Sequence, residues 1–183
     1  MASFPDRLLR AAKLDPELYE EVERDEDALG EAMAVVVASS LAAAIGTGAE
    51  EGLVPALGGV VLSLVSWITW SALSYFVGTR ILPGPKTEAD VGQLLRATGF
   101  ATTPGLLRIV GVVPALRPLA FVAAGLWTLA AMVVAIRQAL DYDSSRRAIA
   151  VCVIGFLLQA LVVGFLIASF GGGPEPATAP ATA

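Results

Sequence analysis

The sequence predicts an all-α fold: a polytopic integral membrane helical bundle of five transmembrane helices with short interfacial helices. Three observations support this fold class. Hydrophobic residues make up 56% of the 183 residues, which is more than an ordinary soluble domain contains. They form a series of apolar stretches between residues 28 and 170, each long enough or nearly long enough to cross a bilayer. Almost every Lys and Arg falls outside these stretches, as in proteins that cross the membrane repeatedly.

Residues 1–27 precede the first apolar stretch and are predicted to be a cytoplasmic segment that is first amphipathic and then acidic. Phe4 and Leu8 recur at helical spacing, whereas Arg7 and Arg10 step by three along another face. This pattern is typical of a helix that lies in the lipid headgroup region and is attracted by its basic face. A solvated helix or a frayed terminus is the alternative.

Asp15 and Pro16 predict a second short helix, because Asp is a good N-cap and Pro fits the first helical position. Four acidic residues then stand at the entry to the first apolar stretch: Asp25, Glu26, Asp27 and Glu31. We expect them to complement the positive N-terminal end of the helix that begins there. A divalent-cation site or an acidic enzyme site is the alternative, although the order of the acids fits no calcium-binding loop.

A single membrane domain is predicted from residue 28 to residue 170. Its five spans are expected at about 28–45, 53–77, 100–116, 119–136 and 148–170. Four of these segments are continuous apolar runs. Residues 100–116 differ because they contain Pro104, Gly105 and Pro114, so this segment is either a kinked span or a re-entrant hairpin.

The loop after the second span is predicted to begin with a turn and to continue as a short cytoplasmic helix. Residues 82–85 read Leu-Pro-Gly-Pro, a sequence typical of a turn. Thr87 and Asp90 have the spacing of a capping box, and Val91 and Leu94 then belong to one apolar stripe. We therefore expect a helix capped at Thr87 that lies against the membrane.

The distribution of cations favours a crossing by residues 100–116. Ten Lys and Arg residues flank the apolar stretches: Arg7, Arg10, Lys13, Arg24, Arg80, Lys86, Arg96, Arg137, Arg146 and Arg147. Cytoplasmic loops collect Lys and Arg, and all ten share one side of the membrane only if this segment crosses. The sequence thus predicts a cytoplasmic N-terminus and an external C-terminus. The tail, residues 171–183, is rich in Gly, Pro, Ala and Thr and is predicted to be disordered.

The inventory of reactive side chains argues against catalysis. The chain contains no His, which removes the commonest general base and metal ligand. Its single cysteine, Cys152, excludes an intramolecular disulfide and lies in an apolar run, where a thiol behaves as a small hydrophobic group. The sequence predicts no enzyme activity, no catalytic, cofactor-binding or metal-binding residue, no cofactor and no nucleic-acid partner.

Two residues inside the apolar stretches are candidates for a special role. Arg108 is a cation within a predicted span, and such a residue usually faces a partner or a cavity. The alternative for Arg108 is that it reaches toward the membrane interface from a short segment. Trp127 lies near the middle of the fourth predicted span, where its indole N–H needs a hydrogen-bond partner.

The third predicted span carries a family resemblance. Residues 99–104 read Gly-Phe-Ala-Thr-Thr-Pro, which resembles the Gly-Tyr-x-x-x-Pro element that opens the third span of the Yip (Ypt-interacting protein) domain family. Leu126 and Trp127 are similar to the family's fourth helix, and the likeness covers about residues 14–170. Phe100 replaces the usual Tyr, and the Asp-Leu-Tyr-Gly-Pro element of some eukaryotic members is absent. The candidate motif or structural residues are Gly99, Phe100, Pro104, Arg108 and Trp127.

The resemblance implies a five-span helical fold with a cytoplasmic N-terminus. Eukaryotic members associate with Rab-type GTPases and with each other in vesicle traffic and membrane shaping, so a GTPase partner is implied by the resemblance alone. The Ala- and Arg-rich sequence looks more like the prokaryotic members, which implies the plasma (inner) membrane of a prokaryote.

The predicted function is that of a non-enzymatic integral membrane protein, a scaffold that organises the bilayer or binds other membrane proteins. Small residues four apart, such as Ala34 with Ala38 and Ala120 with Ala124, favour close helix contacts or self-association. The expected partners are the lipid bilayer and other membrane proteins or further copies of this chain. The alternative is a small transporter or channel that uses the broken third segment and Arg108.

Overall fold

The computed structural model describes residues 2–48 and 52–170, and this part of the chain is all-helical. The α-helices are α1 (Phe4–Ala12), α2 (Pro16–Arg24), α3 (Ala28–Gly46), α4 (Leu53–Phe76), α5 (Val91–Phe100), α6 (Arg117–Ala139) and α7 (Ser145–Phe170). A π-helical turn, η1 (Val77–Ile81), continues α4, and two 3₁₀ helices, η2 (Thr103–Val112) and η3 (Pro114–Leu116), precede α6. The predicted all-α bundle is confirmed. The tail predicted to be disordered lies outside the described residues.

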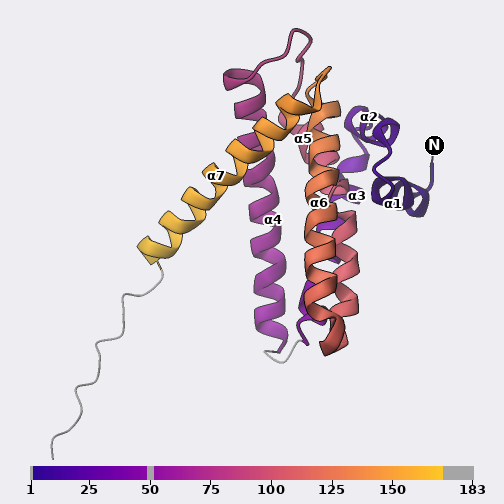
Figure 1. Cartoon of the computed structure of the whole chain (residues 1–183), viewed down its shortest axis with the longest axis vertical. Coiled ribbons are helices and arrows are strands. Elements are labelled where there is room, and N and C mark those ends of the chain that lie inside the picture. The colour runs from indigo at the N-terminus through magenta and orange to yellow at the C-terminus, as the bar shows by residue number, and fades with distance from the viewer. Residues whose placement is uncertain (1, 49–51, 171–183) are drawn as a thin grey trace, which may run out of the picture.

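The long helices are arranged as a bundle, and residues 4–31, which we call the cap, lie toward one end of it (Figure 1). Helices α3, α4 and α6 run alongside one another, whereas α7 starts beside the end of α6 and leaves the bundle at an angle (Figure 1). The short helices α1 and α2 lie against the side of the bundle toward the same end (Figure 1). The four continuous spans predicted from the sequence match α3, α4, α6 and α7 within three residues at each limit.

Four helices, not five, are long and apolar enough to cross a membrane within the described residues. They cover Ala28–Gly46, Val54–Ile81, Pro114–Ala139 and Ser145–Phe165. The prediction of five transmembrane helices is therefore wrong in number, because residues 100–116 form no helix of spanning length. Helix α5 ends at Phe100, and the 3₁₀ helix η2 has Pro104 in its first turn. The prolines lack the N–H that would continue an α-helix, and Pro114 follows directly after η2 and Val113.

Helix α5 and η2 together carry the chain from the capped end of the bundle to the opposite end (Figure 1). A 3₁₀ helix rises about 2 Å per residue, so a short run of it covers a long distance. Helix η2 packs against α3 and α6, and α5 packs against α2, α3, α4 and α6. The segment does not return to the end where it began, as a re-entrant hairpin would.

Two helix starts show how the sequence sets the limits of the short helices. The Asp15 carboxylate accepts from the Glu17 N–H at 3.0 Å, as expected for the N-cap of α2. The predicted capping box of α5 is wrong by three residues: Asp90 is the N-cap, and its side chain and that of Gln93 accept from each other's N–H groups at 2.9 and 2.8 Å. Thr87 instead donates to the Leu140 carbonyl at 2.9 Å and ties this loop to the end of α6.

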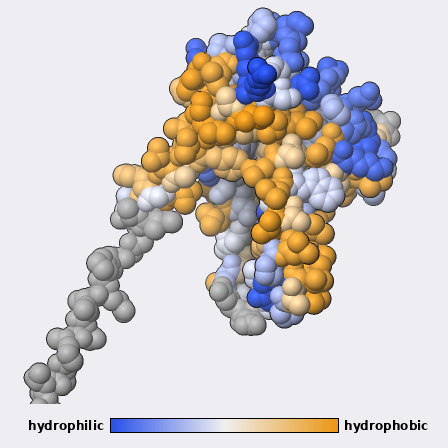
Figure 2. Space-filling view, viewed as in Figure 1, coloured by the Kyte–Doolittle hydropathy of each residue, from blue (hydrophilic) through white to orange (hydrophobic). Residues whose placement is uncertain are grey.

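The densest core lies at the capped end, where α2 and α5 meet the long helices. Its largest fully buried side chains include Leu18, Tyr19, Leu94, Phe100 and Leu140. The outer faces of the long helices carry many large hydrophobic side chains, and hydrophobic surface covers much of the bundle in Figure 2. Hydrophilic surface gathers at the capped end (Figure 2). This distribution suits a bundle surrounded by hydrocarbon with one charged end in water.

Candidate functional site

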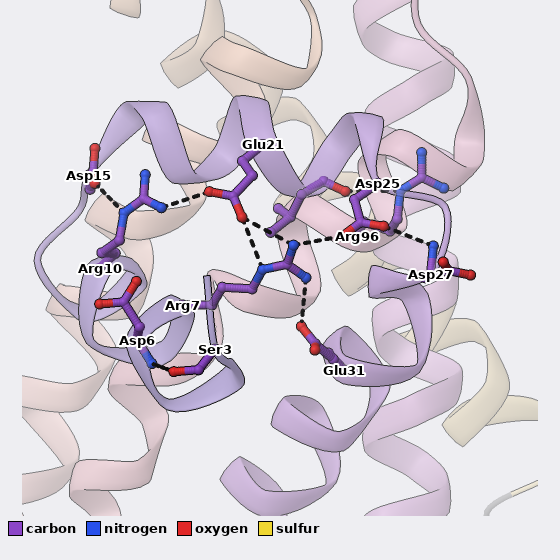
Figure 3. A network of polar contacts seen from close by, with 11 residues as sticks. Ser3, Asp6, Arg7, Arg10, Asp15, Glu21, Asp25, Asp27, Glu31 and Arg96 are labelled. Atoms are coloured by element: carbon purple, nitrogen blue, oxygen red, sulfur yellow. Dashed lines mark hydrogen bonds and ion pairs between the residues drawn. The ribbon is translucent and has the colours of Figure 1, made fainter. Parts of the chain in front are cut away.

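Arg7 joins three helices at the capped end. Its side chain is 5% exposed and lies between carboxylates from α2, α3 and the turn that links them (Figure 3). Nε donates to Glu21 Oε1 at 3.1 Å, Nη2 to Asp25 Oδ2 at 2.6 Å, and Nη1 to Glu31 Oε2 at 2.9 Å. A buried guanidinium with three carboxylate partners is strongly held, because each hydrogen bond is assisted by charge.

Arg10 extends the same network by one turn of α1. Its Nε donates to Asp15 at 2.7 Å, and its Nη1 donates to Glu21 at 2.7 Å (Figure 3). The hydrogen bond from Arg10 lowers the pKa of Asp15, and the hydrogen bond from Arg7 lowers the pKa of Asp25. These carboxylates therefore remain charged at neutral pH and hold α1 against α2.

The ion pairs overturn part of what the sequence predicted for this region. Helix α1 forms, and Phe4 and Leu8 pack against the core, but Arg7 and Arg10 bind carboxylates of the same chain instead of facing lipid phosphates. Asp25, one of the acids considered for a cation site, accepts from Arg7. The pairs join residues 5 to 24 positions apart, so no helical periodicity reveals them. This network of ion pairs holds the cap together.

Arg96 and Glu23 fasten the cap to the bundle. The Arg96 guanidinium, on α5, donates to the Val22 carbonyl at 3.1 Å and also to the Glu23 carbonyl, and so satisfies the end of α2. The Glu23 side chain is 5% exposed, and its Oε2 has no hydrogen-bond partner among the described residues. Burial, together with repulsion from Asp141, raises the pKa of Glu23 to about 7.

The residues of the family-like motif lie in the packed region where α5 meets α3. Gly99 faces Ala32: a Cβ added at Gly99 would lie 2.7 Å from the Ala32 Cβ, so only glycine allows this approach. Phe100 is fully buried, and Pro104 is buried at the start of η2. All three residues are therefore packed in the interior, and Pro104 lacks the N–H that would continue α5.

Trp127 connects the cap to the middle of α6. Its Nε1 donates to the Ala12 carbonyl, at the end of α1, at 2.9 Å, although 41% of the residue remains exposed. Trp67 finds its partners on α5, since its Nε1 lies 3.2 Å from both the Leu95 carbonyl and Thr98 Oγ1. The structure thus gives Trp127 the hydrogen-bond partner that its position in the span requires.

A cavity of about 1030 Å³ lies among α3, α4, η2, α6 and α7. Most of its wall is apolar or made of small residues, and hydroxyl groups of Ser39, Ser63 and Ser66 belong to residues that line it. Arg108 also lines this cavity. The sequence reveals the small residues but not the cavity, because its lining comes from elements that only the tertiary fold brings together.

Arg108 points back along η2 toward the middle of α3. A Cβ added at Gly105 would lie 3.3 Å from Arg108 Nη1 and 2.0 Å from Ser39 Oγ, so guanidinium and hydroxyl flank the same point. Among the described residues, Arg108 forms neither an ion pair nor a hydrogen bond. This position favours the cavity-facing interpretation over a side chain that extends toward the membrane interface.

The pattern of spans and the sequence at the start of η2 agree with the comparison to known families. Residues 14–167 match the Yip1 domain, so the match begins just after α1 and continues into α7. Neither the curated proteins nor the solved structures give a significant match to the chain. Because the match covers most of the chain and the helices are of spanning length, this multi-pass membrane protein belongs to the Yip1 domain family.

Proposed function

We propose that this protein is a non-enzymatic scaffold that organises the membrane by binding other membrane proteins or further copies of itself. The observation that carries the proposal is an apolar stripe on α7, the helix that leaves the bundle (Figure 1). Val153, Leu157, Leu161 and Phe165 recur every four residues and are 52%, 62%, 69% and 70% exposed. Residues at this spacing share one helix face, which offers a partner helix a continuous surface for van der Waals packing.

The scaffold proposal is tested by co-purification of two differently tagged copies, and of partners from native membranes, in a mild detergent. We expect association that falls when Leu157, Leu161 and Phe165 are changed together to Ala. The matched control changes Val61, Leu62 and Val65 of α4, which are also 54–64% exposed, to Ala. Association that is absent from the wild type, or that both triple variants lose equally, would contradict the proposal.

The orientation in the membrane is also a proposal: a cytoplasmic cap, an external C-terminus and, by resemblance, a prokaryotic plasma membrane. Its support is that the cation-rich loops share one end of the bundle. Arg147 donates to the Pro83 carbonyl at 3.3 Å, and Lys86 lies 3.6 Å from Asp143. In a Cys152→Ser background, cysteines placed at Ser3 and at Ala183 should react with an impermeant reagent from opposite sides. Reaction of both from one side would overturn this orientation.

A second candidate function, solute transport, is favoured by the cavity beside Arg108 and the broken segment that carries it. The purified protein in sealed vesicles distinguishes the two functions. Specific solute flux that Arg108→Gln abolishes would support transport, whereas α7-dependent association without flux would support the scaffold. Arg117→Gln is the matched control, because Arg117 lies outside the cavity lining and donates to the Gly111 carbonyl at 3.2 Å.

A further inference from the structure

We propose that the cavity among α3, α4, α6 and α7 binds an anionic lipid taken from the surrounding bilayer. The negatively charged headgroup would pair with Arg108, and an acyl chain would lie along α4 and α6. This inference goes beyond the scaffold function and does not depend on it. Four features of the cavity support the proposal: its shape, its side opening, its charge and the free space beside two of its glycines.

The shape of the cavity suits a chain rather than a compact solute. The α4 residues that line it extend from Pro55 to Trp70, about 22 Å along the helix axis. One leaflet contributes roughly 15 Å of hydrocarbon, so the cavity is long enough for an acyl chain. Trp67 and Trp70 belong to its lining and are only 7% and 6% exposed, and Trp67 is hydrogen-bonded to the Leu95 carbonyl. The buried core beyond them closes the cavity toward the cap.

The cavity opens through the side of the bundle. Val122 and Leu126 of α6 line it and are nevertheless 60% and 65% exposed. In Figure 2, less hydrophobic surface lies below α7, bordered by the hydrophobic surface of the bundle. In a membrane, an opening between apolar flanks faces lipid tails rather than water. The bilayer is therefore the nearest source of an occupant.

The charge of the cavity selects an anion. Arg108 is the guanidinium in its lining, and no described carboxylate pairs with it. A cation within a membrane segment is costly unless an opposite charge or a polar cavity accommodates it. A guanidinium offers several N–H donors in a plane, which match the oxygens of a phosphate. The Ser39 hydroxyl beside it adds a further polar group at the same place.

Two glycines in the lining of the cavity, on different helices, leave room for an added Cβ. A Cβ added at Gly59 of α4 or at Gly125 of α6 meets no atom within 4 Å, and both residues line the cavity. Gly99, by contrast, is in tight contact with α3. We therefore expect a larger side chain at Gly59 to occupy part of the cavity, since its Cβ meets no protein atom. This provides a variant that fills the site while leaving Arg108 in place.

Fluorescence quenching by brominated lipids measures occupancy directly. The chain has three tryptophans, and in a Trp127→Phe background the two that remain, Trp67 and Trp70, both line the cavity. The protein is reconstituted in vesicles of phosphatidylcholine with an increasing fraction of phosphatidylglycerol, and either lipid carries bromine on its acyl chains. We expect phosphatidylglycerol to associate about fivefold more strongly than phosphatidylcholine, the effect of one cation on an anionic lipid.

The variants separate the charge from the space. Arg108→Gln should abolish the preference for phosphatidylglycerol, while Arg108→Lys, which keeps the charge, and Arg117→Gln, the control cation, should retain it. Gly59→Leu should reduce quenching by both lipids. Gly58→Leu is the matched control, since Gly58 lies outside the lining and also has free space around its Cβ. Its quenching should equal that of the parent protein.

Three results would overturn the proposal. Equal quenching of the parent protein by the two lipids would show that Arg108 selects no headgroup. Equal effects of Gly59→Leu and Gly58→Leu would show that lipid does not enter the cavity. Loss of the preference when inorganic phosphate is added at constant ionic strength would show that the site takes an aqueous anion. That last outcome would favour transport and leave the scaffold test on α7 unaffected.

Discussion

Arg7 is buried and Arg108 is half-buried, and the two cations have opposite surroundings. Arg7 has three carboxylates at 2.6–3.1 Å and is 5% exposed. Arg108 lines a cavity of about 1030 Å³ and has no ion-pair partner among the described residues. A buried cation is therefore not in itself a sign of function. The cation whose charge is matched within the chain holds the cap together, and the unmatched cation is the one available to a ligand.

The space around glycines also differs between the cap and the cavity. Near the cap, Gly99 permits a contact with Ala32 that any Cβ would obstruct, whereas Gly59 faces open space in the cavity. Close packing near the cap predicts that substitutions there cost stability. Open space predicts that substitutions at the cavity change ligand binding and leave stability nearly unchanged. Four substitutions in or near the cap test the first of these expectations.

The largest expected effect is that of Arg7→Gln. Removing one member of a buried ion-pair network leaves the remaining charges without partners, and we expect a loss of about 4 kcal/mol of unfolding free energy. Reversible unfolding in mixed detergent, followed by circular dichroism, measures the loss. Arg24→Gln is the control, because the Arg24–Glu20 pair is 69% and 46% exposed and should contribute less than about 0.5 kcal/mol. Equal losses for the two variants would contradict the assigned role of Arg7.

Glu23→Gln should change how stability depends on pH. The folded-state pKa of Glu23 is raised to about 7 by burial and by repulsion from Asp141, above its usual value of 4.5. A raised carboxyl pKa means that the folded state keeps its proton more tightly. The protonated Glu23 carboxyl therefore contributes to the free energy of unfolding. This contribution is fully present below about pH 4.5 and is lost as the pH rises to about 7. The total is roughly 3 kcal/mol.

Unfolding measured at intervals from pH 4.5 to pH 8 tests this expectation. The wild type should lose stability across that window, and Glu23→Gln, which is neutral throughout, should lose much less. Glu26→Gln is the control, since Glu26 is exposed and its charge is not among those that shift the Glu23 pKa. Identical pH profiles for the wild type and Glu23→Gln would show that the buried carboxyl does not carry the effect.

Gly99→Ala should cost about 2 kcal/mol, the usual effect of overpacking a filled core. The added Cβ would lie 2.7 Å from the Ala32 Cβ and 3.1 Å from the Ala32 carbonyl oxygen, so α5 and α3 must separate. The control is Gly30→Ala on α3, where an added Cβ meets nothing and the higher helix propensity should stabilise by up to about 1 kcal/mol. An unchanged free energy of unfolding in Gly99→Ala would mean that α5 and α3 can separate at little cost.

Hydropathy predicted α3, α4, α6 and α7 well because a bilayer requires each crossing to be a long apolar helix. It failed at residues 100–116 for a physical reason. Hydropathy measures apolarity, whereas helix continuity there depends on the missing N–H of Pro104 and on tertiary contact. Gly105 approaches α3 so closely that an added Cβ would lie 2.0 Å from Ser39 Oγ. Neither the 3₁₀ geometry nor that contact follows from composition.

The candidate sites were predictable to different degrees. Arg108 stood out because a cation in an apolar stretch is rare, but its cavity is lined by elements that only the tertiary fold brings together. The partners of Arg7 were missed because Glu31 is 24 positions away in the sequence. The partner of Trp127 is 115 positions away. Local periodicity identifies which residues need partners, and the tertiary fold decides which partners they find.

The smallest expected effect concerns the contact between the cap and the part of the bundle that holds the cavity. Trp127→Phe removes the 2.9 Å hydrogen bond to the Ala12 carbonyl and should cost about 1 kcal/mol. Because the ion pairs of Arg7 remain, only the end of α1 should open more often. Trypsin cleavage after Lys13, an exposed residue just past that end, should become about fivefold faster. Cleavage after Lys86 in the same molecule is the internal control, and equal acceleration at both sites would indicate general destabilisation rather than release of the cap.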